Sequence, residues 1–238
     1  MKIVAVFDMD RTLTRRGTWA GWLRFWLRHE APWRVLLLPL LLGPLLAYRA
    51  GRLGRGELKA AVQAVVMGGR VQGRRVRAAA ARYAAHVVAD ELFEGARDAL
   101  AAARRDGAVV VIATASNAYY AQDIGAALGV DHVISTRMGW EDSGEGDWLV
   151  ARLASPNCYG EAKAGMVRDW LATEGLAGAR VDAWSDHVSD LPLLELAVAS
   201  GGRAVAANAS AALRAVAEAR GWPVVDWGVV RGSLLERA

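Results

Sequence analysis

The segment MKIVAVFDMDRTLT, residues 1–14, begins with a short apolar run and changes abruptly to acidic and hydroxyl side chains. Three of the five residues at Ile3–Phe7 are β-branched, and the run lacks polar alternation, which is typical of a strand buried on both faces of a parallel sheet. Asp8 and Asp10 follow this strand at once. Because the apolar run is shorter than the core of a secretory signal peptide, we expect no such signal.

Four further apolar runs of this kind lie downstream, at 109–113, 132–136, 180–184 and 203–206. Helical patterns separate them, and one of these patterns ends at Gly107, a typical helix stop. Strands that alternate with helices predict an α/β fold, here a doubly wound, mostly parallel and Rossmann-like sheet. Residues 137–153 carry a Ser-Gly-Glu-Gly turn between Trp-bearing flanks, which predicts a β-hairpin.

Residues 15–88 break this alternation of strands and helices. They are helical in composition and contain no convincing strand. We therefore predict two domains, an α/β core formed by residues 1–14 and 89–238 and a helical cap formed by residues 15–88.

Composition and charge restrict the compartment and the partners. The single cysteine, Cys158, excludes an intramolecular disulfide and fits a reducing compartment, so we expect a cytoplasmic protein. The formal net charge of +4 is too small to indicate a nucleic-acid partner. Of the 29 basic residues only Lys2, Lys59 and Lys163 are lysines.

Pairs of carboxylates follow two of the predicted strands. Asp8 and Asp10 come after the first strand, and Asp186 and Asp190 come after the strand at 180–184. Ligands of open α/β sheets bind beyond the carboxyl ends of the strands, so we expect both pairs to converge on one crevice. Four carboxylates would repel one another there, and a hard divalent cation such as Mg²⁺ would relieve this repulsion.

Two further residues add phosphate-binding chemistry to this crevice. Thr114 ends the strand at 109–113 and precedes a helix, whose free N–H groups favour anions. Lys163 lies near the start of another helix. Carboxylates, a cation, a hydroxyl and an ammonium together predict a phosphoryl-transfer site. Each residue also has a purely structural interpretation, in which Thr114 and Asp190 cap helices and Lys163 is solvated.

These residues occur in an order that resembles a known family. The motifs Asp8-x-Asp10-x-Thr12, Thr114, Lys163 and Asp186-x-x-x-Asp190 resemble those of haloacid dehalogenase superfamily phosphatases, in the subfamily with a helical cap that includes phosphoserine phosphatase. The resemblance covers the chain apart from the insertion. One departure is Arg11, where the family usually has glycine, and it predicts either a strained backbone, an altered loop or a guanidinium that reaches the substrate.

The resemblance implies a role for each motif. Asp8 would be the nucleophile that forms an aspartyl-phosphate, and Asp10 would be the general acid and base. Asp8, Asp10 and Asp186 would hold Mg²⁺, with Asp190 orienting the metal waters or the lysine. The implied phosphate-binding residues are Thr114, Ala115 and Lys163.

The stretch WRVLLLPLLLGPLLAYRA, residues 33–50, carries no charge between Arg34 and Arg49. A membrane-spanning helix needs about 20 apolar residues, whereas Val35–Tyr48 supplies 14 with two prolines. Trp and Arg side chains flank the stretch and favour a membrane interface, so one hypothesis is peripheral contact through residues 19–48 at the inner face of the membrane. The other hypotheses are packing inside the cap and a homodimer interface.

The predicted substrate depends on which of these hypotheses for the apolar stretch is correct. Hydropathy and position give a looser resemblance to bacterial phosphatidylglycerophosphate phosphatases, which implies a lipid phosphate as substrate. The alternative is a small soluble phosphoester such as phosphoserine. A third hypothesis, a non-catalytic membrane-associated protein on the same fold, is disfavoured by the intact Asp8, Asp10, Lys163 and Asp186.

Overall fold

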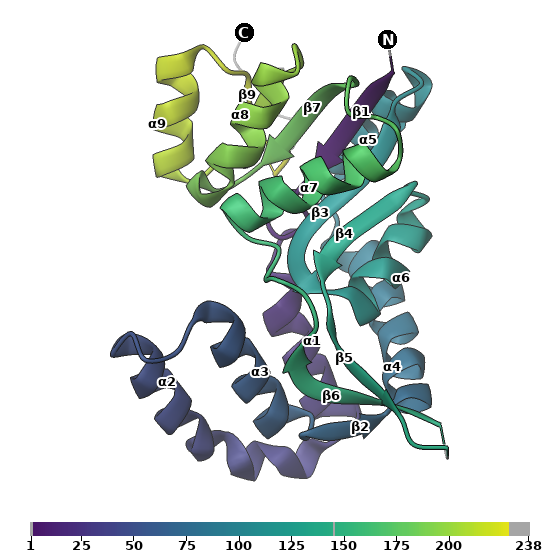
Figure 1. Ribbon diagram of the computed structural model, residues 1–238, viewed down its shortest axis with the longest axis vertical. Helices are drawn as coiled ribbons and strands as arrows, with labels where there is room; N and C mark the ends of the chain where they lie inside the picture. The colour runs from purple at the N-terminus through teal and green to yellow at the C-terminus, as the bar shows by residue number, and fades with distance from the viewer. Residues whose placement is uncertain (1, 145, 229–238) are drawn as a thin grey trace, which may run out of the picture.

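The computed structural model describes residues 2–144 and 146–228, and a six-stranded parallel sheet organises its upper half (Figure 1). The strand order is β4-β3-β1-β7-β8-β9, and every neighbouring pair is parallel. The strands are β1 Ile3–Phe7, β3 Val109–Asn117, β4 His132–Thr136, β7 Arg180–Ser185, β8 Ala204–Ala207 and β9 Val224–Val225. Five of them coincide with the predicted runs to within a few residues. The two-residue β9 was not predicted because it is too short to show a pattern.

Helices cover both faces of this sheet, which confirms the doubly wound α/β fold. They are α5 Glu94–Arg105, α6 Ala118–Leu128, α7 Glu161–Thr173, α8 Leu191–Ala199 and α9 Ala211–Arg220. Alternate residues of β1 serve the two layers. Ala5 and Phe7 pack with α5 and α6, whereas Val4 and Val6 pack with α7, α8 and α9.

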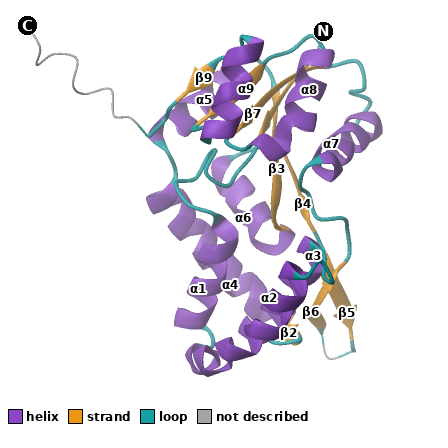
Figure 2. Cartoon of the chain, turned by 90° about the vertical axis from the view of Figure 1, so that its left-hand side faces the viewer, coloured by secondary structure: helices purple, strands orange, loops and turns teal. Residues whose placement is uncertain are grey.

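The insertion lies beyond the carboxyl ends of β1, β3 and β7 (Figure 2). Its elements are α1 Thr18–His29, the 3-10 segment η1 Pro32–Leu41, α2 Leu42–Arg49, α3 Arg55–Val66, β2 Arg70–Gln72, α4 Gly73–His86 and the π-helical segment η2 Val87–Glu91. Strand β2 contradicts the prediction that this region contains no strand. Its three residues are too few for a sequence pattern, and it forms by pairing with a distant segment.

That distant segment is the predicted hairpin. Strands β5 Met138–Asp142 and β6 Asp147–Leu153 pair antiparallel, and β6 also pairs with β2 in a three-stranded sheet. The hairpin therefore packs with the insertion and away from the six-stranded sheet (Figure 1). The division into core and cap at residues 15–88 remains a proposal, in which the hairpin would be counted with the cap.

An aromatic cluster fills the interior of the insertion. Trp22 and Trp26 of α1 are fully buried. The Trp22 ring stacks on Tyr120 at a centroid distance of 5.3 Å and meets Tyr83 edge-on at 5.5 Å. The hypothesis of membrane contact over 19–48 is therefore wrong for these α1 tryptophans, because the helix turns them inward at a spacing of four residues.

The apolar stretch that follows has the opposite character. No residue of η1 or α2 is buried, although Leu38 and Leu41 pack against the interior from one side. The exposed large side chains, which we call the apolar face, are Trp33, Val35, Leu36, Leu40, Leu42, Leu45, Leu46 and Tyr48. The hypothesis that this stretch packs inside the cap is therefore wrong. None of the described helices is long and apolar enough to cross a membrane.

Candidate active site

A cavity of about 580 Å³ lies between the carboxyl ends of the core strands and helices α1 and α3. Asp8 and Asp10 reach it from the end of β1 and Asp186 from the end of β7, as the parallel sheet predicts. Of the predicted site residues, those that line the cavity are Asp8, Asp10, Ala115, Lys163, Asp186 and Asp190. Thr114 is not among them. It is fully buried beneath the cavity, and its Oγ1 accepts the Ser116 N–H at 3.1 Å.

Lys163 links the two carboxylate pairs. Its Nζ donates to Asp8 Oδ1 at 2.7 Å and to Asp190 Oδ2 at 2.6 Å, and Ser185 Oγ donates to the same Asp190 oxygen at 2.7 Å. Burial by itself lowers the pKa of Lys163, but the Asp8 and Asp190 carboxylates outweigh it and raise that pKa above its ordinary value. The lysine is therefore held as an ammonium in the floor of the cavity.

Negative charge remains in excess around this ammonium. Burial raises the pKa of Asp8 to about 7, with Lys163 opposing the rise and Asp190 adding to it. Burial and the Asp190 charge also raise the pKa of Asp186 to about 6. Asp190 Oδ1 is buried and has no hydrogen-bond partner among the described residues. Crowded, partly unpaired carboxylate oxygens of this kind are a donor set that suits Mg²⁺.

The side chains do not form a complete metal cage by themselves. Within residues 2–144 and 146–228, no group of three or more His, Cys, Asp or Glu side chains is arranged to hold a metal ion. The predicted ligand set, which combines the carboxylates of Asp8 and Asp186 with the main-chain carbonyl of Asp10, remains a proposal. Magnesium sites with few protein ligands keep water or phosphoryl oxygens in the remaining positions.

Asp10 is held by hydroxyl and amide groups. Thr18, the first residue of α1, donates from its N–H at 2.7 Å and from its Oγ1 at 2.6 Å to Asp10 Oδ1. Ser116 Oγ donates to the other oxygen, Oδ2, at 3.1 Å. The sequence did not single out Thr18, because no local rule connects a helix start to a carboxylate eight positions earlier. Ser116 of β3 likewise contacts Asp10 from a position that is distant in the sequence.

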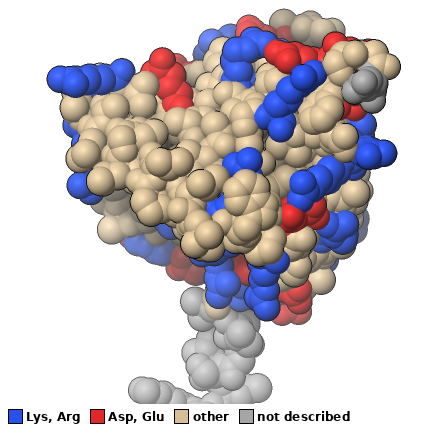
Figure 3. All heavy atoms as spheres, turned by 90° about the horizontal axis from the view of Figure 1, so that it is seen from below, with Lys and Arg blue, Asp and Glu red and all other residues tan. Residues whose placement is uncertain are grey.

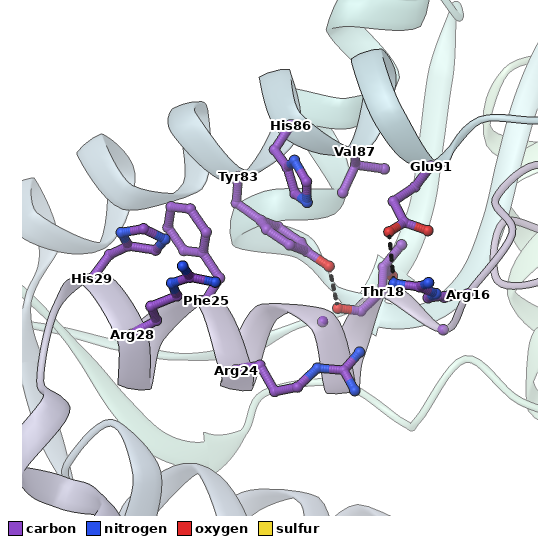
Figure 4. A pocket seen from close by; sticks show the side chains of 12 residues that line it. Arg16, Thr18, Arg24, Phe25, Arg28, His29, Tyr83, His86, Val87 and Glu91 are labelled. Carbon is purple, nitrogen blue, oxygen red and sulfur yellow. Dashed lines mark hydrogen bonds and ion pairs between the residues drawn. The ribbon is translucent and has the colours of Figure 1, made fainter.

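A second cavity backs onto Thr18 from the other side of α1 (Figure 4). It measures about 460 Å³ and contains none of the predicted catalytic residues. Tyr83 reaches across it and donates its hydroxyl to the Thr18 carbonyl at 2.7 Å, and Arg16 pairs with Glu91 at 3.3 Å at the rim. The Tyr83 contact fixes the first turn of α1 and with it the group that holds Asp10.

Thr18 should therefore position Asp10. Replacing Thr18 by Val, which has the same shape, removes the hydroxyl donor and should lower kcat about tenfold at nearly constant KM. The rate of the first step, measured in a single turnover, should fall less for p-nitrophenyl phosphate, whose leaving group needs no proton, than for an alkyl phosphate. Thr18→Ser is the control that keeps the hydroxyl. A kcat loss in Thr18→Ser as large as in Thr18→Val, or an equal loss of the first-step rate for both kinds of leaving group, would contradict the role.

The backbone at Arg11 is left-handed. This agrees with one of the three expectations for a position where the resembling family usually has glycine. The φ of Arg11 is 63°, and its side chain lines the cavity and lowers the pKa of Asp186 against the effect of burial. Asn208, at φ 51°, supports the loop by donating from Nδ2 to Arg11 O at 3.3 Å and to Thr12 O at 3.0 Å. Such a conformation costs a non-glycine residue about 1–2 kcal/mol, so the sequence retains the guanidinium in spite of the strain.

Lys59 of α3 is a buried cation at the cavity that was not predicted from the sequence. It lines the cavity with 7% of its surface exposed, and its Nζ donates to Ala115 O. Burial lowers the pKa of Lys59 to about 8, although Asp10 opposes the shift. The signal was present in the composition, because Lys59 is one of three lysines in an arginine-rich chain. A compact ammonium fits where a guanidinium does not.

Replacing Lys59 by Met should stabilise the protein. The folded-state pKa lies below the ordinary value of 10.5, so the buried charge costs stability in full below pH 8 and the cost disappears as the pH rises from 8 to 10.5. We expect Lys59→Met to be more stable by on the order of 2 kcal/mol at pH 7. Thr136 Oγ1 still donates to Ala115 O at 2.9 Å in the variant.

Denaturant unfolding at several pH values measures this effect. The advantage of Lys59→Met over the wild type should shrink between pH 8 and 10.5, since the wild-type lysine then loses its proton. Lys2→Met, at an exposed lysine, is the matched control and should show neither effect. A destabilised Lys59→Met variant at pH 7 would contradict the account.

Comparisons with known proteins agree with this geometry. The family model described as haloacid dehalogenase-like hydrolase matches residues 5–195. A probable phosphatase of Mycobacterium tuberculosis is 38% identical over 141 residues, which are 59% of this chain and 46% of that protein. A phosphoserine phosphatase of the same organism is 32% identical over 145 residues, 61% of this chain and 44% of that protein. The chain thus spans about half the length of the curated relatives it matches.

Solved structures extend the similarity to the whole fold. A protein of unknown function from Bordetella pertussis Tohama I is 27% identical, with a TM-score of 0.78 over 95% of this chain and 99% of that one. A substrate-bound phosphoserine phosphatase complex shares 17% identity and a TM-score of 0.61 over 94% and 93% of the two chains, which supports the fold alone. With the family model covering most of its length, the chain belongs to the haloacid dehalogenase-like hydrolases.

Proposed function

We propose that this protein hydrolyses phosphomonoesters through an aspartyl-phosphate formed on Asp8. The observation that carries the proposal is that two carboxylates in one cavity have different partners. Asp8 accepts from the Lys163 ammonium as well as from the Thr12 hydroxyl, and the ammonium favours the anion that a nucleophile needs. Asp10 accepts from the Thr18 N–H and from the hydroxyls of Thr18 and Ser116, and hydroxyls can also accept from a protonated carboxyl, so Asp10 can act as acid and base.

The reaction has two steps in this scheme. A carboxylate oxygen of Asp8 attacks phosphorus, the bond to the alcohol oxygen breaks, and Asp10 gives its proton to the departing alcohol. Asp10 then takes a proton from a water molecule that attacks the same phosphorus. The bond between phosphorus and Asp8 breaks, inorganic phosphate leaves, and both carboxylates return to their starting states.

The remaining residues would bind the phosphoryl group and the metal. Lys163 and Ala115 at the β3 end would meet phosphoryl oxygens, whereas Thr114, buried outside the cavity lining, would support this loop, and Asp190 would hold Lys163 in place. Asp8, the Asp10 carbonyl and Asp186 would hold Mg²⁺. When bound, Mg²⁺ would neutralise part of the charge that the phosphoryl group brings to the carboxylates.

A small soluble phosphomonoester is the first candidate substrate. One relative is named a phosphoserine phosphatase, and the comparisons offer no support for a lipid phosphate. The charges of the cavity add a restriction. Outside the four carboxylates and Lys163 of the proposed mechanism, every described Asp, Glu, Lys or Arg that lines the cavity is a cation: Arg11, Arg55 and Lys59. The rest of the substrate should therefore be acidic or uncharged, since an ammonium would find no carboxylate of its own.

A lipid phosphate is the second candidate, and one observation favours it. Tyr48 belongs to the exposed apolar face and also lines the cavity, so the two surfaces are continuous. Trp19 and Leu58 extend this apolar side of the cavity wall.

Phosphate release with Mg²⁺ from a panel of substrates tests the proposal. The panel contains phosphoserine, phosphoglycolate, phosphatidic acid, phosphatidylglycerophosphate and p-nitrophenyl phosphate, with Asp8→Asn as the inactive control. Phosphoglycolate carries a carboxylate and no amine, so it should exceed phosphoserine in kcat/KM. A preference for phosphoserine would overturn the charge argument, and release from none of the esters would overturn the proposed function.

A further inference from the structure

The apolar face is the largest feature that the proposed reaction leaves unexplained. Its leucines are among the most exposed large hydrophobic residues described, with 79% of Leu36 and 63% of Leu42 accessible. Seen from below, the molecule presents a broad area with few charged side chains, and Lys and Arg, with some Asp and Glu, lie at its edges (Figure 3). Contiguous exposed apolar surface of this kind marks a contact with a partner or a membrane.

The charges within the segment that carries the apolar face have one sign. Residues 31–56 contain no Asp or Glu, while Arg49, Arg52 and Arg55 are exposed at the C-terminal end of α2 and beyond it. The two acids that flank this segment are engaged within the protein. Glu30 is paired with Arg75 at 2.8 Å, and Glu57 accepts the Gly54 N–H at 2.6 Å. The segment therefore presents apolar groups and cations to whatever covers it.

We propose that the apolar face docks this protein on an anionic phospholipid bilayer. Leucine side chains and Trp33 would enter the boundary between headgroups and acyl chains, and the arginines would meet the anionic headgroups. The 3-10 segment and α2 are too short to cross the bilayer, so they would lie in its surface. Because Tyr48 joins the apolar face to the cavity, docking would bring the cavity mouth to the membrane.

A second copy of the chain fits the apolar face less well. A two-fold dimer places the same patch on both partners, so the arginine edges of the two copies would approach each other. Like charges brought together in this way repel, and residues 31–56 contain no carboxylate to compensate them. An anionic bilayer satisfies both the apolar centre and the cationic edge.

Vesicle flotation of the full chain tests this proposal without a substrate. We expect binding to vesicles of equal parts phosphatidylcholine and phosphatidylglycerol, and weaker binding to phosphatidylcholine alone. The triple variant Leu36→Ser, Leu40→Ser, Leu42→Ser should bind at least about tenfold less. Arg49→Gln with Arg52→Gln should lose about fivefold per arginine on anionic vesicles only.

Matched controls separate docking from general effects of polarity. Trp140→Ser and Val198→Ser change exposed apolar residues elsewhere, and Arg168→Gln removes an exposed arginine of α7, so none of them should alter flotation. Thermal unfolding and p-nitrophenyl phosphate turnover should match the wild type in every leucine variant. Phosphate release and flotation are separate readouts, so failure of the proposed reaction would leave the docking result interpretable.

Two outcomes would overturn the docking proposal. One is flotation of the leucine variant equal to that of the wild type. The other is a wild-type dimer by light scattering that does not float with vesicles and becomes monomeric in the leucine variant, which would show that a second copy covers the apolar face.

Discussion

Asp8→Asn is expected to lower kcat by at least about 10⁴-fold, because the amide has no anionic oxygen with which to attack phosphorus. The side chains have the same shape, and Lys163 keeps its second partner, Asp190, at 2.6 Å. The variant should therefore fold. Steady-state phosphate release and circular dichroism measure the two effects.

The matched control for this change is Asp182→Asn. Asp182 is a buried carboxylate of β7 that pairs with Arg203 and does not line the active-site cavity. Its replacement should affect stability and leave turnover largely intact. Substantial Mg²⁺-dependent turnover by Asp8→Asn, at wild-type stability, would mean that another group attacks phosphorus.

Lys163→Met should affect both stability and catalysis. Its side chain is 3% exposed and its ammonium lies between Asp8 and Asp190, so the variant leaves two buried carboxylates without their counter-charge. Breaking a buried ion pair from one side costs about 3–5 kcal/mol, and urea unfolding should show a loss of this size at pH 7. The phosphoryl group would also lose its proposed cationic partner, so kcat should fall by at least about 100-fold.

The Lys163→Arg variant helps to separate the effect of the positive charge from the effect of side-chain shape. It keeps the positive charge, so it should recover part of the stability, but the planar guanidinium cannot replace an ammonium that meets two carboxylates within 2.7 Å. Its turnover should stay low. A Lys163→Met variant with wild-type stability and turnover would contradict the account of the cavity floor.

The core of the fold was predictable because its signals are local. Strand β1 and the strands after it are continuous apolar runs, and the acids follow the strand ends directly. The topology of parallel sheets then places those ends together, which is why Asp8 and Asp186 could be assigned to one crevice from the sequence. The candidate residues after β1 and β7 were found in this way, whereas Lys163 of α7 was proposed from its place near a helix start and from the family resemblance.

Contacts between distant segments were not predictable in this way. Strand β2 exists only through its pairing with β6, and Thr18 meets Asp10 only because α1 starts beside the end of β1. Lys59 reaches the cavity from α3, whose packing over the sheet leaves no mark in the local sequence. These residues come from the insertion, whose position is set by tertiary packing.

The orientation of the apolar stretch was also not predictable from the sequence. Hydropathy identified residues 33–50 as unusual, and periodicity could not tell a buried helix from an exposed one. The 3-10 segment η1, with Pro39 inside it, turns Leu36 and Leu40 outward and leaves Leu38 and Leu41 to pack. Only the structure separates these leucines from the buried tryptophans of α1.

The covalent intermediate on Asp8 is the central claim, and one measurement tests it most directly. In Asp10→Asn the attack of Asp8 on p-nitrophenyl phosphate needs no general acid, whereas hydrolysis of the aspartyl-phosphate loses its base. Rapid mixing should show a burst of p-nitrophenol about equal to the enzyme, and acid-quenched samples should carry one phosphoryl group on the peptide that contains Asp8. Steady release of p-nitrophenol with no burst and no phosphoryl group on that peptide would contradict the account.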